Sequence, residues 1–159
     1  MKKSTIPVLY GVYIAIGLIL YFMALSLIGV QTNPIYSLGN GLIVGVGLFF
    51  ALRHYKKEKG IHFEYEKGFM AGLFTGFNAT ILFTIFFAIY VTNINTDFLP
   101  MMLENWSSHY HVGIALVVFV AAIMGFATTF VLTLTFMQLF KDSWNTHEKK
   151  MSETTEVQR

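Results

Sequence analysis

Four long hydrophobic runs, separated by shorter polar stretches, dominate the pattern of this chain. They cover residues 7–29, 35–52, 68–92 and 112–139, and none contains Asp, Glu, Lys, Arg or His. About 20 apolar residues carry a helix across a hydrocarbon core of about 30 Å, so the second run is just sufficient and the others are ample. The pattern predicts an all-α polytopic membrane protein: a transmembrane domain over residues 1–140, with four transmembrane helices in a compact bundle.

Polar residues mark where the predicted helices begin and end. Asn33 and Pro34 suit the cap and the first position of the second helix. That helix is expected to continue to about Lys59, where Gly60 provides a left-handed cap. In the segment 93–111, apolar residues recur at helical spacing, which predicts a short amphipathic helix in the membrane interface. The polar tail, residues 141–159, is expected to be cytoplasmic and disordered.

Composition and charge place the chain in the membrane with a definite orientation. Charged residues make up 13% of the chain, against about 25% in soluble proteins. All eleven Lys and Arg residues lie near the N-terminus, in the segment 53–67 or in the tail, and the segments 30–34 and 93–111 carry none. The positive-inside rule therefore predicts cytoplasmic N- and C-termini and a cytoplasmic segment 53–67.

The basic start and the first hydrophobic run also resemble a signal peptide with a cleavage site near Ser26. Signal peptides have a hydrophobic region of about 7–15 residues. The first run is longer and continues past this site, so we expect it to remain as a membrane span.

Small residues recur at four-residue spacing in the predicted helices. Helices in lipid associate through close packing, which small residues permit, and positions four apart stay close to one face. We expect a compact bundle packed through these faces, and packing against a second copy of the chain is the alternative. The helix-packing positions are Gly68, Gly72 and Gly76 in the third span, Ser37, Gly41 and Gly45 in the second, and Gly125 in the fourth.

The depth of these residues in the membrane gives an expected pairing of the second and third spans. Gly45 and Gly76 fall at similar depth when both spans are counted from their cytoplasmic ends. In that register Gly68 and Gly72 face Leu52 and Phe49, and we expect phenylalanine side chains to fill the glycine groove.

Few side chains are candidates for chemistry. Asn78 lies deep in the third span, about 120° from the glycine face, which favours an interhelical hydrogen bond and leaves a polar substrate site as the alternative. His109 and His111 are weak candidates for a divalent metal site, because residues two apart do not share a helix face. We interpret the threonines of the fourth span as packing residues. No catalytic motif, cysteine or cofactor fingerprint is present, so we expect no catalytic residue and no cofactor.

Two stretches carry a resemblance to a known family. Tyr10-Gly11 opens the first span, and HYKKEKGIHFEYEKGF leads directly into the helix that holds Gly68 and Gly72. Over roughly residues 7–140 the chain resembles a bacterial family known as a domain of unknown function (number four-one-nine-nine). The resemblance implies a four-helix bacterial membrane protein, and it brings no activity or site residues with it. We expect the protein to lie in the bacterial inner membrane.

The sequence favours a non-enzymatic role. Ionisable residues inside spans are the usual markers of proton-coupled transport, and the four runs have none. We expect a small structural or accessory membrane protein that contacts lipid, packs with itself or with a membrane protein partner, and binds no nucleic acid. The alternative is a transporter or channel subunit, with a path between the glycine-rich second and third spans near Asn78.

Overall fold

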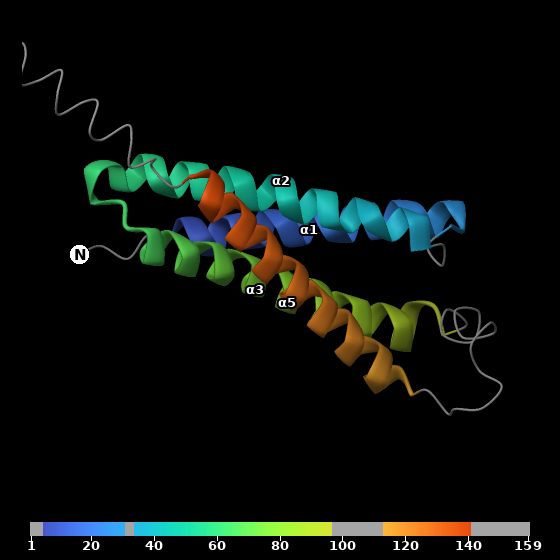
Figure 1. Ribbon diagram of the computed structural model, residues 1–159. Coiled ribbons are helices and arrows are strands. Elements are labelled where there is room, and N and C mark those ends of the chain that lie inside the picture. Colours follow the sequence, from blue (N-terminus) through green and yellow to red (C-terminus); the bar gives the residue numbers. More distant parts are fainter. Residues whose placement is uncertain (1–4, 31–33, 97–112, 141–159) are drawn as a thin grey trace, which may run out of the picture.

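Four long helices and two short helical turns make up the structure (Figure 1). The computed structural model of the protein describes residues 5–30, 34–96 and 113–140. The elements are α1 (Ile6–Ile28), α2 (Pro34–Lys59), the 3₁₀ turn η1 (Gly60–His62), α3 (Tyr65–Ile89), the π-helical turn η2 (Tyr90–Ile94) and α5 (Ile114–Leu139).

All four long helices are long and apolar enough to cross a membrane. The prediction of an all-α bundle with four spans is therefore confirmed, and the chain is a multi-pass membrane protein. The bounds of α1 and α5 agree closely with the first and fourth hydrophobic runs. The third span starts slightly earlier than predicted, at Tyr65, and continues through η2 to Ile94.

Backbone conformation explains where two of the helices end. Gly29 closes α1 at a φ of 76°, and its N–H donates to the Ser26 carbonyl. The predicted end of α2 is confirmed, because the helix runs to Lys59 and Gly60 follows with a φ of 50°. Positive φ is accessible to glycine without steric cost, so both glycines terminate helices that would otherwise continue.

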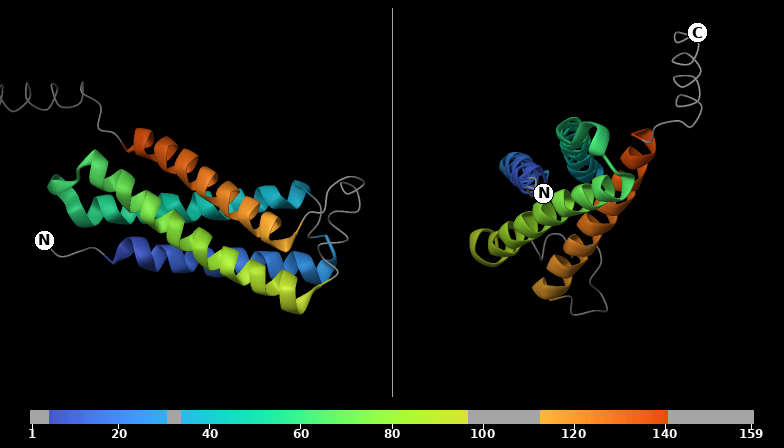
Figure 2. Two further views of the ribbon diagram at one scale, coloured as in Figure 1. Left: turned by 90° about the horizontal axis from the view of Figure 1, so that it is seen from below. Right: turned by 90° about the vertical axis from the view of Figure 1, so that its left-hand side faces the viewer.

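The helices form two antiparallel hairpins, α1–α2 and α3–α5, with α3 slanting across α1 (Figures 1 and 2). The most extensive contact joins α1 to α3, the next joins α3 to α5, and α2 touches α5 much less. Helix α3 is thus the central element. The start of α1, the α2–α3 connection and the end of α5 lie at one end of the bundle, which we call the basic end because the described basic residues, 53–67, lie there.

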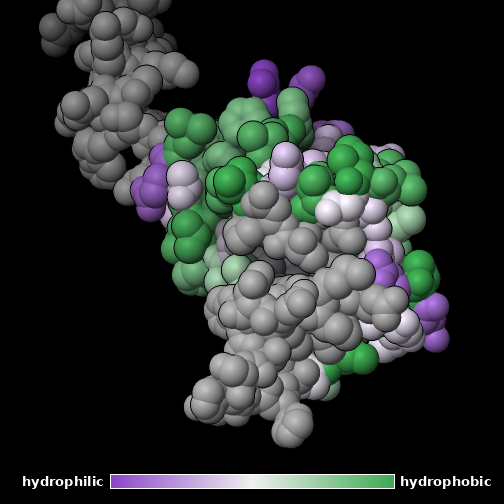
Figure 3. Space-filling model, turned by 90° about the vertical axis from the view of Figure 1, so that its right-hand side faces the viewer, coloured by the Kyte–Doolittle hydropathy of each residue, from purple (hydrophilic) through white to green (hydrophobic). Residues whose placement is uncertain are grey.

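Aromatic and aliphatic side chains fill two clusters inside the bundle. One surrounds Phe22 of α1 and includes Phe87 near the end of α3 and Tyr90 and Val91 of η2. The other lies nearer the basic end and joins α1, α2 and α3 through Ile14, Leu18, Leu48 and Ala79. The outer faces are apolar too, as the hydrophobic flanks in Figure 3 show. A bilayer accounts for such faces, since its acyl chains are as apolar as the side chains.

Several predictions from the sequence fall outside the described residues. They are the capping role of Asn33, most of the amphipathic segment 93–111, the histidines His109 and His111, and the tail from 141 to 159.

Candidate functional site

The glycine face of α3 is filled mainly by α5, together with Phe63 at Gly68. Met137, Thr133 and Thr129 lie against Gly68, Gly72 and Gly76 in turn, and one step further Thr80 of α3 lies against Gly125 of α5. Each four-residue step along α3 is matched by a four-residue step in the opposite direction along α5. We call these eight residues the glycine–threonine seam.

The seam brings the two backbones too close for larger residues. A Cβ added at Gly72 would lie 2.5 Å from Thr133 Cγ2, and one at Gly125 would lie 2.6 Å from Thr80 Cγ2. Real Cβ atoms essentially never approach another atom within 3.0 Å. Thr129, Thr133 and Met137 are fully buried as a result. Glycine at these positions therefore sets the distance between α3 and α5.

The structure differs from the expected pairing of the second and third spans. Leu52 of α2 does reach Gly72, at 3.3 Å from the Cβ position, but Thr133 occupies the groove more closely. Phe49 instead stacks on Phe140, with ring centroids 5.6 Å apart. A phenylalanine does enter the groove at Gly68, but it is Phe63, just before α3, whose Cζ lies 2.6 Å from the position of an added Cβ. At Gly72 and Gly76 the shorter threonine side chains let α3 and α5 approach. The groove is filled within the chain, as favoured, but mainly by α5.

The threonine hydroxyls separate into two groups. Thr128 and Thr135 face outward and donate to the carbonyls of Met124 and Val131, at 2.8 and 2.9 Å. The hydroxyls of Thr129 and Thr133 are buried without a hydrogen-bond partner. They face glycine Cα–H groups, which offer weak C–H···O contacts. This arrangement suits packing rather than chemistry.

The small residues of α2 that were predicted to pack against other helices differ in how closely they approach them. A Cβ at Gly45 would lie 3.9 Å from Leu132, whereas one at Gly41 would meet nothing within 4 Å, and Ser37 is exposed. The closest contacts of α2 with α1 come from Gly39 and Gly47, which were not assigned a packing role. They accommodate Tyr21 and Ile14 of α1, respectively.

Asn78 faces α1 rather than the space between α2 and α3. Its Cβ lies against Gly11, at 2.8 Å from the position of an added Cβ. Its side-chain amide donates to the Phe74 carbonyl of its own helix, at 2.7 Å. The hydrogen bond is therefore within α3, not between helices. A path between α2 and α3 would not meet this side chain.

A second amide was overlooked in the sequence. Asn40 lies inside the hydrophobic run of α2, and its Oδ1 atom is buried without a hydrogen-bond partner. An unpaired buried polar atom costs about 1–3 kcal/mol. Its position within an otherwise apolar run was the signal that could have identified it.

A polar cluster joins α1 to η2 and to Asn95, at the end of the bundle opposite the basic end. The hydroxyls of Ser26 and Tyr90 lie 2.5 Å apart, and the Asn95 amide donates to the Tyr90 oxygen at 3.3 Å. Either hydroxyl of the Ser26–Tyr90 pair can be the donor. Tyr90 is buried and begins the π-helical turn η2. Sequence reasoning missed this cluster, since its residues are far apart in the chain.

Replacing Tyr90 with phenylalanine is expected to lower the stability of the bundle by about 1 kcal/mol, because one net hydrogen bond contributes roughly that amount. Thermal unfolding in detergent measures the loss. Ser26→Ala should have a similar effect, and the double variant should lose little more. Tyr13→Phe is the matched control, since Tyr13 is 58% exposed. Additive losses in the double variant would show that the two hydroxyls do not interact.

Chemistry-bearing clusters are scarce in the described part of the chain. No group of three or more His, Asp or Glu residues there is placed to hold a metal ion. His109 and His111 lie outside it, so the weak metal prediction stays a prediction.

A known protein family matches most of the chain. The family described as "Protein of unknown function (DUF4199)" matches residues 9–110, which include most of α1, all of α2, α3 and η2, and end before α5. The resemblance expected over roughly residues 7–140 is thus shown over a shorter range. Comparison with curated proteins and with solved structures finds no match. The match covers more than half of the chain, which therefore belongs to the DUF4199 family of proteins of unknown function.

Proposed function

We propose that this protein is a small non-enzymatic accessory protein of the bacterial inner membrane, which acts by packing with itself or with a membrane protein partner. The observation that carries the proposal is the glycine–threonine seam. The glycines of the seam allow α3 and α5 to pack closely. The four hydrophobic runs contain no Asp, Glu, Lys, Arg or His.

The exposed face of α5 is the surface that we propose for contact with a partner helix. Its contacts with the rest of the bundle run mainly through α3, with fewer to α2. Large side chains elsewhere on it are exposed, among them Phe119 at 62% and Met124 at 63%. In a bilayer such a face is available to lipid or to another membrane helix, and close packing is what would select a helix over lipid.

The buried amide of Asn40 favours a transporter or channel subunit as the second candidate. Polar groups inside a membrane are costly, and they often mark a path for substrate or water. Thr84 in α3 also has a buried hydroxyl without a partner. A passive path would therefore be sought near Asn40 rather than near Asn78.

Cysteine labelling distinguishes these two candidates. The chain has no native cysteine, so Asn40→Cys, Gly45→Cys and Asn78→Cys can each be treated in membranes with a membrane-impermeant thiol reagent that reacts only in water. Protection of all three is expected for the accessory protein. His62→Cys, at an exposed position, is the reactive control, and Leu42→Cys, at 69% exposure, is the lipid-facing control. Rapid labelling at position 40 would overturn the accessory role in favour of a wet path.

A further inference from the structure

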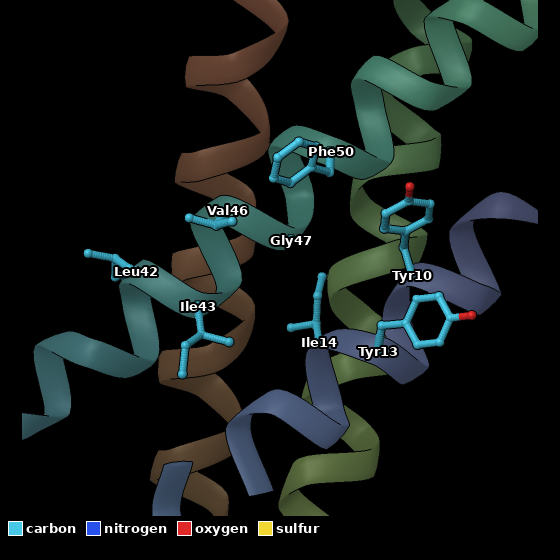
Figure 4. Close-up of a pocket in the computed structure, with 8 residues that line it drawn as sticks. All are labelled: Tyr10, Tyr13, Ile14, Leu42, Ile43, Val46, Gly47 and Phe50. Carbon is cyan, nitrogen blue, oxygen red and sulfur yellow. The ribbon is translucent and has the colours of Figure 1, made fainter. Parts of the chain in front are cut away.

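An apolar groove lies between α1 and α2 on the outside of the bundle (Figure 4). It has a volume of about 390 Å³. Ile14 of α1 and Gly47 of α2 meet at its floor, where an added Cβ at Gly47 would lie 2.7 Å from Ile14 Cδ1. Leu42, Val46 and Phe50 line its α2 wall, and all three are about half exposed or more. The groove is thus preformed and open toward the membrane.

One end of the groove is aromatic and polar. Tyr10 and Tyr13 lie there beside Phe50, whereas Leu42 lies at the other end (Figure 4). The Tyr10 hydroxyl is 3.2 Å from His54 Nδ1, and the two rings meet edge to face with centroids 5.9 Å apart. This pair fixes the wall of the groove at the basic end of the bundle, where tyrosine suits the level of lipid headgroups.

Two basic residues continue the same face of α2 beyond the groove. Arg53 and Lys57 follow Phe50 by three and seven positions, the spacing that keeps residues on one side of a helix. Both are exposed, and no ion pair to either is found among the described residues.

The other described lysines have different partners. Lys56 donates to the Phe140 carbonyl at 2.8 Å, Lys59 lies 3.9 Å from Glu58, and Lys67 pairs with Glu64. Among the described lysines and arginines, Arg53 and Lys57 are therefore the cations that remain available to a ligand in the groove.

The distances suit one lipid leaflet. From Leu42 to Arg53 the helix rises about 16 Å, at about 1.5 Å per residue. Half of the hydrocarbon core of a bilayer is roughly 15 Å. An acyl chain that fills the groove would therefore place its phosphate near the two cations.

We infer that this groove binds an anionic phospholipid, with one acyl chain along Leu42, Val46 and Phe50 and the phosphate group at Arg53 and Lys57. The apolar lining selects a lipid over a soluble anion, and the two cations, which have no ion pair within the described part of the chain, select an anionic headgroup over a zwitterionic one. Under the positive-inside rule this lipid belongs to the cytoplasmic leaflet. The site requires the membrane location of the protein but not its non-enzymatic role.

Lipid binding to the purified full chain in detergent tests this inference. Phosphatidylglycerol and phosphatidylcholine with identical acyl chains are titrated, and retained lipid is measured by native mass spectrometry. Phosphatidylglycerol is expected to bind at least about tenfold more tightly, given attraction to two cations. Equal retention of the two lipids would overturn the site. Soluble glycerol phosphate is expected not to compete, and competition at the concentration of the lipid would overturn a lipid site in favour of a simple anion site.

Two matched pairs of variants localise the binding. Arg53→Gln with Lys57→Gln is expected to weaken phosphatidylglycerol binding about tenfold, whereas Lys59→Gln with Lys67→Gln removes the same charge from paired lysines and should leave it unchanged. Val46→Trp should block the groove, and Val131→Trp on α5, also exposed, should not. Equal effects within either pair would overturn the assignment. Lys57→Gln alone, at an exposed position, repeats the charge test if the double variant is not monodisperse.

Discussion

Replacing Gly76 with alanine is expected to lower the stability of the bundle by about 1–3 kcal/mol, the usual cost of overpacking a closely packed core. The added methyl group would overlap Thr129, whose Cβ lies 2.8 Å from the position of the new Cβ. That carbon is attached directly to the backbone of α5, so α5 itself must move. A leucine at position 76 should separate the two helices altogether. Thermal unfolding in detergent measures both losses.

A compensating change makes this prediction specific to the seam. Thr129→Gly removes the side chain that fills the groove, so the double variant with Gly76→Ala is expected to recover most of the lost stability. Gly41→Ala is the matched control, because an added Cβ there meets nothing within 4 Å; it should be neutral or slightly stabilising, since alanine favours helix by about 1 kcal/mol. Equal losses at positions 41 and 76 would contradict the role of the seam.

Neutralising the basic segment of the α2–α3 connection is expected to disturb the orientation of the chain. The five basic residues between 53 and 67 bear most directly on the placement of this segment under the positive-inside rule. With all five changed to glutamine, we expect a large fraction of chains to place the connection on the other side or to fail to insert α2 and α3. The residues are Arg53, Lys56, Lys57, Lys59 and Lys67.

Reporter fusions at residue 62 and at the C-terminus measure this fraction, using one reporter that is active only in the cytoplasm and one that is active only outside it. Exchanging each Lys for Arg and Arg for Lys at the same five positions is the control, because charge is kept while the side chains change. An unchanged cytoplasmic signal from the glutamine variant would refute the orientation proposed for the basic end.

The hydrophobic pattern was sufficient to predict the four long helices of this protein, but not the short turns η1 and η2. A helix that crosses a bilayer must be apolar over about 20 residues, so each span appears in the sequence as a continuous hydrophobic run. Local signals placed some of the ends, as with Gly60, whose left-handed conformation stops α2.

The partners of the helices were decided by the tertiary structure. In lipid every helix face is apolar, so the pattern does not indicate which face turns inward or toward which neighbour. The sequence identified Gly72 and Gly76 as a groove, but the matching positions of Thr133 and Thr129 became apparent only when α5 was seen beside α3.

Single positions illustrate the same limit. The sequence predicted the same packing role for Gly41 and Gly45, yet of these two only Gly45 approaches a neighbouring helix. Asn78 forms a hydrogen bond within its own helix, and Tyr90 forms one with Ser26, which lies 64 positions away in the sequence. Bilayer thickness and charge act on each segment separately, so the sequence of one segment is enough to predict their effect on it. Close packing depends on the shapes of two segments at once, and for that reason only the folded bundle determined it.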